Sequence, residues 1–278
     1  MRRWRGSTGT APTSPTSTPA AAPTISTTDA QNGAVVVSLS SSTRGATIYY
    51  TTDGSSPGPS TLQYFAPFLV ASSLTVKAVT VANGYTPSSI ASQSFANNIP
   101  SNTLVWSAEF ANSTGANAAP NPKVWTYDTG NNGFGNQELE NYCAWGSATS
   151  PCDPMNPNAY VDTSGILHIV ARQPAAGVYT SARMKTKGLF SFQYGRLEAR
   201  MKLPESQGMW PAFWTLGNNI ATIGWPACGE LDVMEHIDGR NPPLNGSPAP
   251  YDWVQSSIHG TGLNGGQPNH AAGFTATA

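Results

Sequence analysis

Three carboxylates fall within residues 229–236, which read GELDVMEH. Glu230 and Asp232 are two residues apart, so a regular strand places them on one face and turns Glu235 to the other. If the two residues before Glu235 together oppose a single partner residue, a β-bulge returns Glu235 to the face of Glu230. The spacing therefore predicts three acids along one cleft floor, with Leu231 and one bulge residue filling the core behind them.

Carboxylates this close repel one another, which raises the pKa of at least one of them. A cleft that holds one ionised and one protonated carboxyl is equipped for acid/base chemistry on a sugar acetal, that is, for glycoside hydrolysis. Acids at alternating strand positions also occur on ordinary solvated faces, and the octapeptide alone leaves that interpretation open.

Aromatic residues stand close to the acids in the sequence. Trp210, Trp214 and Trp225 all lie within about twenty residues of Glu230. Large rings of this kind often fill a core, and their faces also stack on the apolar faces of sugar rings. For Phe213 we favour the core, whereas for the three tryptophans we favour a polysaccharide cleft.

Six motifs, in order along residues 102–262, resemble glycoside hydrolase family 16, specifically its bacterial endo-β-1,3-glucanase (laminarinase) branch. They are LVWSAEF (104–110), GFGNQE (133–138), YTSAR (179–183), YGRLEAR (194–200), WPAFW (210–214) and GELDVMEH (229–236). The bulged acid motif is similar to the laminarinase form, and a version one residue shorter is typical of lichenases.

The resemblance implies a role for each acid. Glu230 matches the family's nucleophile, Asp232 the residue that positions it, and Glu235 the general acid/base. The implied reaction is a retaining double displacement on β-1,3-glucan, with the two carboxyls about 5 Å apart. Another β-glucan or a galactan as substrate, and a glucan-binding protein without turnover, remain alternatives.

The same resemblance implies a set of substrate contacts, namely Asn136, Arg183, Trp210, Trp214, Trp225, His236 and His259. Asn136 also suits a Gly-rich turn for backbone reasons, and Arg183 also suits a surface ion pair. The two histidines with the acids show no metal-ligand spacing such as H-E-x-x-H, so we expect no catalytic zinc and no cofactor for the chemistry. Glu109 matches one position of the family's structural calcium site, so calcium is an expectation for the intact domain.

Composition is consistent with a neutral polymer as partner. The 278-residue chain has a net charge of −1, only 10% charged residues and 10% aromatic residues. No basic surplus is present to neutralise phosphates, and no apolar run is long enough to cross a bilayer. We expect neither nucleic acid nor membrane as a partner, and we expect a monomer.

Three cysteines leave one unpaired in any disulfide scheme. Cys143 and Cys152 flank a short Pro-containing loop and can bridge in an oxidising compartment, although two free thiols are almost as plausible there. Cys228 precedes the acid motif without an evident histidine partner, so we do not expect it to be a nucleophile.

The chain divides into three predicted parts. Residues 1–23, rich in Pro, Ser and Thr, predict a disordered linker. Such linkers join modules of exported glycan-degrading enzymes, so we expect an extracellular location, although the Arg-rich start lacks the apolar segment of a secretion signal. Residues 24–98 predict a small β-sandwich, with strands at 34–39, 47–52, 74–81 and 89–95.

The segment 46–54, ATIYYTTDG, resembles the fibronectin III-like module at the ends of chitobiase and other hexosaminidases. Tyr49, Tyr50 and Tyr64 are candidates for carbohydrate attachment, and a spacer whose tyrosines pack its own core is the interpretation we favour.

Residues 99–278 predict a β-jelly-roll of the concanavalin A-like kind, so the whole chain is expected to be all-β. Predicted strands cover 166–171, 194–203 and 254–259, with alternation at 196–202 more typical of a solvated face. Compared with the family, we expect this domain to be incomplete at its C-terminus, and therefore unstable or prone to aggregate as written.

Overall fold

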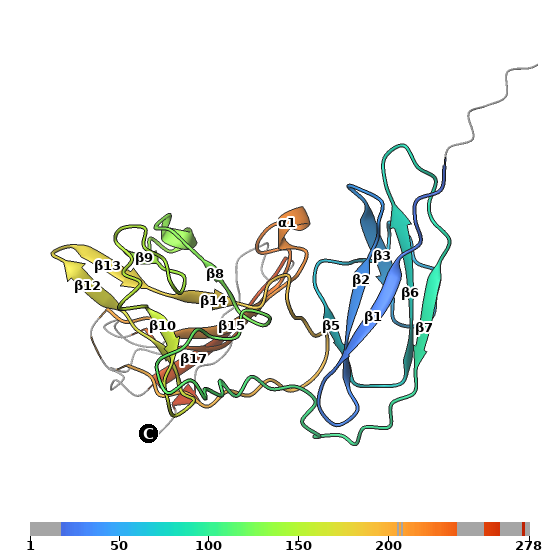
Figure 1. Ribbon diagram of the computed structural model, residues 1–278. Helices are drawn as coiled ribbons and strands as arrows, with labels where there is room; N and C mark the ends of the chain where they lie inside the picture. Colours follow the sequence, from blue (N-terminus) through green and yellow to red (C-terminus); the bar gives the residue numbers. More distant parts are fainter. Residues whose placement is uncertain (1–17, 205, 207, 238–252, 262–273, 276–278) are drawn as a thin grey trace, which may run out of the picture. The chain divides into compact units, whose positions relative to one another are not determined.

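The computed structural model describes residues 18–204, 206, 208–237, 253–261 and 274–275 (Figure 1). Residues 1–17 of the predicted linker lie outside this range, so the state of that part stays a prediction. Residues 18–23 do not form a free linker, because Pro19 pairs with Thr86 and Ala20 is buried. The regular elements of the described chain are almost all strands, which confirms the all-β prediction. It divides into two compact units, one formed by 1–28, 37–64 and 71–99, the other by 29–36, 65–70 and 100–278.

Seven strands come from residues 24–95. They are β1 (Thr24–Asp29), β2 (Val35–Ser40), β3 (Thr47–Thr51), β4 (Leu62–Gln63), β5 (Phe68–Val70), β6 (Leu74–Val81) and β7 (Ala91–Phe95). They form a three-stranded sheet in the order β1-β2-β5 and a four-stranded sheet in the order β4-β3-β6-β7. The four strands predicted in this part are confirmed within one or two residues at their ends.

Apolar side chains at alternating positions explain why these segments become strands. In β2, Val37 and Leu39 are buried, and in β6 the buried positions include Val76 and Ala78. Side chains two residues apart in a strand share a face, so each run supplies one buried stripe. Burial of these stripes is the main favourable contribution to folding of the segment.

The candidate tyrosines of the β3–β4 region pack on one another rather than standing free. The rings of Tyr50 and Tyr64 meet edge to face, with centroids 6.4 Å apart. Burial raises the pKa of Tyr50 to about 12, with a further contribution from Tyr64. These contacts favour the spacer interpretation over carbohydrate attachment for Tyr50 and Tyr64.

Residues from 100 onward supply short strands in four sheets. The strands are β8 (Thr126–Asp128), β9 (Glu140–Tyr142), β10 (Ala159–Val161), β11 (Leu167–Ile169), β12 (Arg172–Ala175), β13 (Val178–Ser181), β14 (Arg183–Lys185), β15 (Ala212–Leu216), β16 (Glu230–Glu235), β17 (Trp253–His259) and β18 (Phe274–Thr275). The sheet orders are β10-β11, β12-β13-β9, β14-β8 and β15-β16-β17-β18. One 3-10 turn, η1 (Gly133–Gly135), and one short helix, α1 (Ile220–Ile223), interrupt the strands.

One predicted strand is wrong. Residues 194–203 are irregular, and most of their side chains are exposed. The charged and apolar residues alternate as they would in a strand, but this stretch pairs with no strand in the described part of the chain. A strand exists only where a neighbour satisfies its backbone, and periodicity in sequence cannot supply that neighbour.

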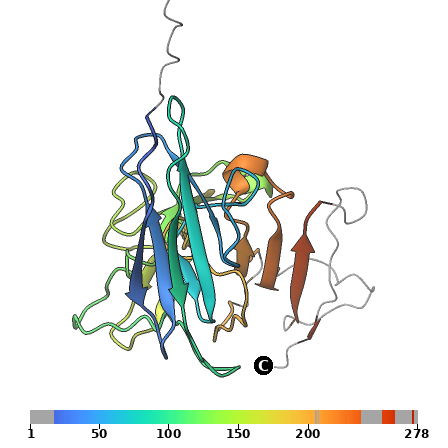
Figure 2. The same ribbon diagram turned by 90° about the vertical axis from the view of Figure 1, so that its right-hand side faces the viewer.

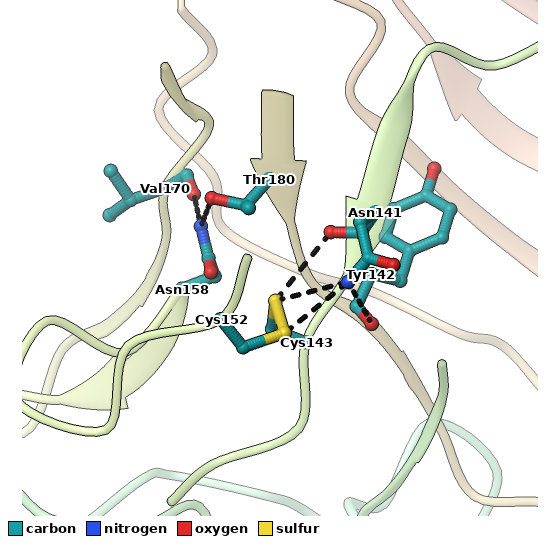
Figure 3. Close-up of a disulfide and its surroundings, with 7 residues drawn as sticks. All are labelled: Asn141, Tyr142, Cys143, Cys152, Asn158, Val170 and Thr180. Atoms are coloured by element: carbon teal, nitrogen blue, oxygen red, sulfur yellow. Dashed lines mark hydrogen bonds between the residues drawn. A yellow bond between two sulfur atoms is a disulfide. The ribbon is translucent and has the colours of Figure 1, made fainter. Parts of the chain in front are cut away.

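A disulfide joins Cys143, at the end of β9, to Cys152 (Figure 3). It closes the loop between them, and Cys228 is the free cysteine. The Asn141 side-chain amide lies 3.3 Å from the Cys152 sulfur. Of the two states that the sequence left open, the structure has the bridged one.

A buried amide ties neighbouring strands together beside this disulfide. Asn158 donates its side-chain N–H to the Val170 carbonyl at 2.7 Å and to the Thr180 hydroxyl at 3.0 Å (Figure 3). Both Asn158 and Thr180 are buried, so the hydrogen bonds offset the cost of removing these polar groups from water.

Within the described residues, no helix is long and apolar enough to span a membrane.

Candidate active site

The acid motif forms β16, and its pairing contains the predicted bulge. Against β17, Asp232 pairs with Ser257 and Glu235 with Gln255, so two residues of β16 oppose Ser256 alone. The pairing with β15 shifts at the same place. Phe213 pairs with Met234 and Trp214 with Asp232, so the register passes over Val233. This irregularity confirms the bulge that the spacing of the acids predicted.

Contacts across β17 show which way the acids point. Glu235 contacts the side chain of Gln255, and Asp232 contacts the side chain of His259. Gln255 and His259 are four residues apart on β17 and therefore share a face. Glu230, two residues before Asp232, lies on that face as well, so the three acids form one row.

The prediction that Leu231 and a bulge residue fill the core is wrong for Leu231. Leu231 is 51% exposed and Val233 is 38% exposed, whereas Met234 is buried. Ile258, on β17, is likewise 47% exposed. The face of the sheet opposite the acids therefore retains contact with solvent.

A tight approach of the backbone leads into β16. Gly217 follows β15 and donates its N–H to the Gly229 carbonyl at 3.0 Å. A Cβ at Gly217 would overlap the carbonyl of Cys228. Only glycine fits here without moving the backbone, so the start of the acid strand is fixed against β15.

Indole N–H groups donate to both glutamates. Trp225 Nε1 lies 2.8 Å from Glu230 Oε2, and Trp210 Nε1 lies 3.0 Å from Glu235 Oε1. The second oxygen of Glu235 accepts from Gln255 Nε2 at 2.9 Å. Hydrogen bonds to an ionised acceptor are stronger than those between neutral groups, so these donors hold the carboxylates in place.

Asp232 sits between the two glutamates and is only 6% exposed. Burial and then the carboxylates of Glu235 and Glu230 raise the pKa of Asp232 to about 6. His259 opposes this rise, because its Nε2 lies 2.9 Å from Asp232 Oδ2. The expectation that repulsion within the row would raise the pKa of one acid is met at Asp232.

Arg183 is held in a network of acids and rings rather than at a free surface. Its guanidinium is 3.4 Å from both Asp128 and Glu138. It also lies over the rings of Trp214 and Phe134, with its central carbon 4.8 and 5.0 Å from the ring centroids. A guanidinium stacked on a ring is attracted by the ring's face, so Arg183 fixes the orientation of Trp214.

The network extends through Tyr142 in β9. The Tyr142 hydroxyl donates toward Glu138 at 2.5 Å and lies 2.9 Å from Glu140. Burial, followed by these carboxylates, raises the pKa of Tyr142, so the phenol stays protonated. Glu138 thus has Arg183 on one side and Tyr142 on the other.

The remaining predicted substrate contacts differ in their surroundings. Asn136 is exposed and donates to Glu138 Oε1 at 3.1 Å. Trp225 is 52% exposed and Trp210 38% exposed, as a ring-stacking platform requires. His236 is buried at 2% exposure, so it packs beneath the site instead of reaching a polymer above it.

Sequence reasoning missed the partners of the acids on the neighbouring strand. Gln255, Ser257 and His259 alternate along β17 and pair with the three acids, but only His259 was singled out. The alternation of polar side chains next to an acid strand is the signal that could have identified Gln255. Asp128 carries no comparable signal, because its partners Arg183 and Lys185 are distant in sequence.

The calcium site expected at Glu109 stays a prediction. Glu109 is exposed, and it belongs to no group of three His, Cys, Asp or Glu side chains within the part of the chain that the structure describes. The one such group there is Glu230, Asp232 and His259, which lies in the acid row itself.

Two family models match the chain. Residues 26–92 match the chitobiase/beta-hexosaminidase C-terminal domain, and residues 152–278 match glycosyl hydrolases family 16. A beta-glucanase of Rhodothermus marinus is 40% identical over 165 residues, covering 58% of this chain and 49% of the relative. Glucan endo-1,3-beta-glucosidase A1 of Niallia circulans is 34% identical over 156 residues, covering 50% of this chain and 20% of the relative.

Among solved structures, the catalytic domain of an endo-1,3-beta-glucanase (laminarinase) from Thermotoga petrophila is 34% identical, covers 63% of each chain and gives a TM-score of 0.46. The chain spans about half the length of the Rhodothermus relative and a fifth of the Niallia relative. Residues 152–278 are therefore similar to glycosyl hydrolases family 16, and residues 26–92 are similar to the chitobiase/beta-hexosaminidase C-terminal domain.

Proposed function

We propose that the chain carries the catalytic acids of an endo-acting β-1,3-glucan hydrolase that works by a retaining double displacement. The observation that carries the proposal is the bulge in β16, which sets Glu230 and Glu235 on the same face with an indole N–H on each. Two carboxyls that flank a glycosidic bond are the equipment for a nucleophile and an acid/base.

In the proposed reaction, Glu230 attacks the anomeric carbon while Glu235 protonates the leaving oxygen. Glu235 then removes a proton from water, which releases the sugar from Glu230 and restores both groups. Asp232 lies between them with a pKa raised to about 6, so below about pH 6 it holds a proton that it can donate to Glu230 in a hydrogen bond. His259 stabilises the ionised form of Asp232 through its 2.9 Å contact.

Aromatic surfaces supply the proposed substrate contacts. Trp210 and Trp225 offer exposed ring faces directly beside the carboxylates that their N–H groups hold. Trp214 is oriented by Arg183, and Asn136 is exposed at the edge of the same network. Ring faces suit an uncharged glucan, whose apolar faces stack without any ion pair.

The relatives' names guide the choice of β-1,3-glucan. The curated relatives reported above are named a beta-glucanase and a glucan endo-1,3-beta-glucosidase, and the solved structure is titled a laminarinase. An extracellular location is part of the proposal, because a polymer of this kind is met outside the cell. For the module matched at 26–92, we propose a spacer, since Tyr50 and Tyr64 pack on each other.

The test measures reducing ends released from laminarin by the parent chain and by Glu230→Gln. We expect release by the parent and a loss of at least about 1,000-fold in the variant, since the nucleophile is absent. Glu198→Gln is the matched control, because Glu198 is an exposed acid paired only with Arg196 among the described residues. Equal rates for parent and Glu230→Gln would refute the catalytic assignment.

A second measurement separates the two glutamates. With azide added, Glu230→Ala is expected to form the α-glycosyl azide, and Glu235→Ala the β-glycosyl azide, because azide replaces a different group in each variant. If Glu230→Ala gave the β-azide and Glu235→Ala the α-azide, the nucleophile and acid/base roles of the two glutamates would be reversed. Binding of laminarin by the parent without release would instead favour a glucan-binding protein.

A further inference from the structure

The bulge and the carboxylate of Glu235 both have partners on β17 that the proposed mechanism does not use. The strands β15, β16 and β17 lie side by side in the orange to red part of the chain (Figure 2). Gln255 pairs with Glu235, and Ser256 faces the bulge. These two residues are neither nucleophile nor acid, but they contact the elements that decide where Glu235 points.

Ser256 closes the bulge. Its hydroxyl donates to the carbonyl of Val233 at 2.9 Å. A bulge places an extra residue in one strand and leaves part of the hydrogen-bond ladder unmade, so the carbonyl of the extra residue needs another donor. The Ser256 hydroxyl is that donor, and it holds the kink that turns Glu235 to the face of Glu230.

Gln255 holds the carboxylate itself. Its amide N–H donates to Glu235 Oε2 at 2.9 Å, while Trp210 donates to Oε1 at 3.0 Å. The two donors come from opposite sides, one from β17 and one from the segment before β15. With both oxygens engaged, rotation of the carboxylate about its last bond breaks at least one hydrogen bond.

We propose that Gln255 and Ser256 are positioning residues for the general acid/base, Ser256 by fixing the bulge and Gln255 by fixing the carboxylate rotation. The proposal rests on the proposed function, because it concerns how the acid of that reaction is aimed. A general acid acts only when its proton lies within hydrogen-bond reach of the leaving oxygen. A displacement of about 1 Å is enough to cost a large part of the rate.

The proposal predicts a dependence on the leaving group. A sugar or alkyl leaving group needs protonation by Glu235, whereas dinitrophenolate leaves without it. For Gln255→Met, which keeps length but removes the donor, we expect kcat/KM on laminarin to fall about 10- to 100-fold. On a 2,4-dinitrophenyl β-laminaribioside, kcat/KM of the same variant should stay within about threefold of the parent's value. The reason is that kcat/KM reports the first displacement, and dinitrophenolate leaves in that step without protonation.

Ser256 provides an independent pair of variants. Ser256→Ala removes the hydroxyl and should lower kcat/KM on laminarin about 3- to 10-fold, again sparing the dinitrophenyl substrate. Ser256→Thr keeps the hydroxyl and should stay within about twofold of the parent, as a β-branched residue suits a strand. Gln173→Met is the control for the Gln→Met change, because Gln173 is an exposed residue of β12.

The outcomes separate this proposal from the proposed function. If the parent hydrolyses neither substrate, the proposed function fails and the positioning roles fall with it. If the parent is active but Gln255→Met lowers kcat/KM equally on both substrates, Gln255 is structural and the positioning role is refuted. If Gln255→Met does not fold, the Ser256 pair decides, and equal damage from Ala and Thr would overturn the role of the hydroxyl.

Discussion

Replacing Asp232 by Asn should change how the stability of the domain that carries the acid motif depends on pH. In the folded chain the pKa of Asp232 rises from 3.8 to about 6, through burial and the carboxylates of Glu235 and Glu230. Below about pH 4 the carboxyl is protonated in both the folded and the unfolded chain. Between about pH 4 and 6 the unfolded chain loses this proton first, so stability falls as pH rises.

The size of the effect follows from the same two pKa values. A difference of about two pKa units corresponds to on the order of 3 kcal/mol of unfolding free energy. Asparagine has the same shape and can still accept a hydrogen bond from His259, but it never ionises. The free energy of unfolding of Asp232→Asn, relative to the parent, should therefore increase by about 3 kcal/mol between about pH 4 and pH 7.5.

Urea unfolding of both proteins at several pH values measures this difference. Asp162→Asn is a control of opposite sign, because the hydrogen bond from His168 is the first cause that lowers the pKa of Asp162. That variant should be less stable than the parent near neutral pH, with the gap closing as the solution becomes acidic. If the difference between Asp232→Asn and the parent does not change with pH, the account of the acid row is refuted.

Three further perturbations test the surroundings of the acids. Trp225→Phe removes the 2.8 Å donor to Glu230, so kcat on laminarin should fall about tenfold with the fold intact, and an unchanged kcat would remove that role. Arg183→Lys loses the planar stack on Trp214 and should lower the free energy of unfolding by about 1–2 kcal/mol in urea titrations. An unchanged free energy of unfolding would contradict a stabilising role for the Arg183 network. Replacing Cys143 and Cys152 together by Ala should lower the free energy of unfolding by about 2–3 kcal/mol, because the bridge no longer restricts the unfolded chain. Urea unfolding of the variant is compared with that of the parent, with and without reductant. An unchanged midpoint would show that the bridge does not constrain the unfolded chain.

The acid strand was predictable because its information is local. The side-chain period of a strand is two, so the spacing of Glu230, Asp232 and Glu235 either needs a bulge or splits the acids between faces. The same local rule gave the strands at 35–40 and 74–81, where apolar residues alternate. It misled at 194–203, because alternation without a pairing partner does not make a strand.

The sequence by itself determined the all-β class, the two-module order and the row of acids, since each follows from periodicity or from motifs within a few residues. Only the tertiary structure decided that Gln255 holds Glu235, that Arg183 is locked between Glu138 and Trp214, and that Leu231 stays half exposed. Such contacts join residues 20 to 45 positions apart or depend on what covers a face. They are set by how strands pair and pack, which no local pattern records.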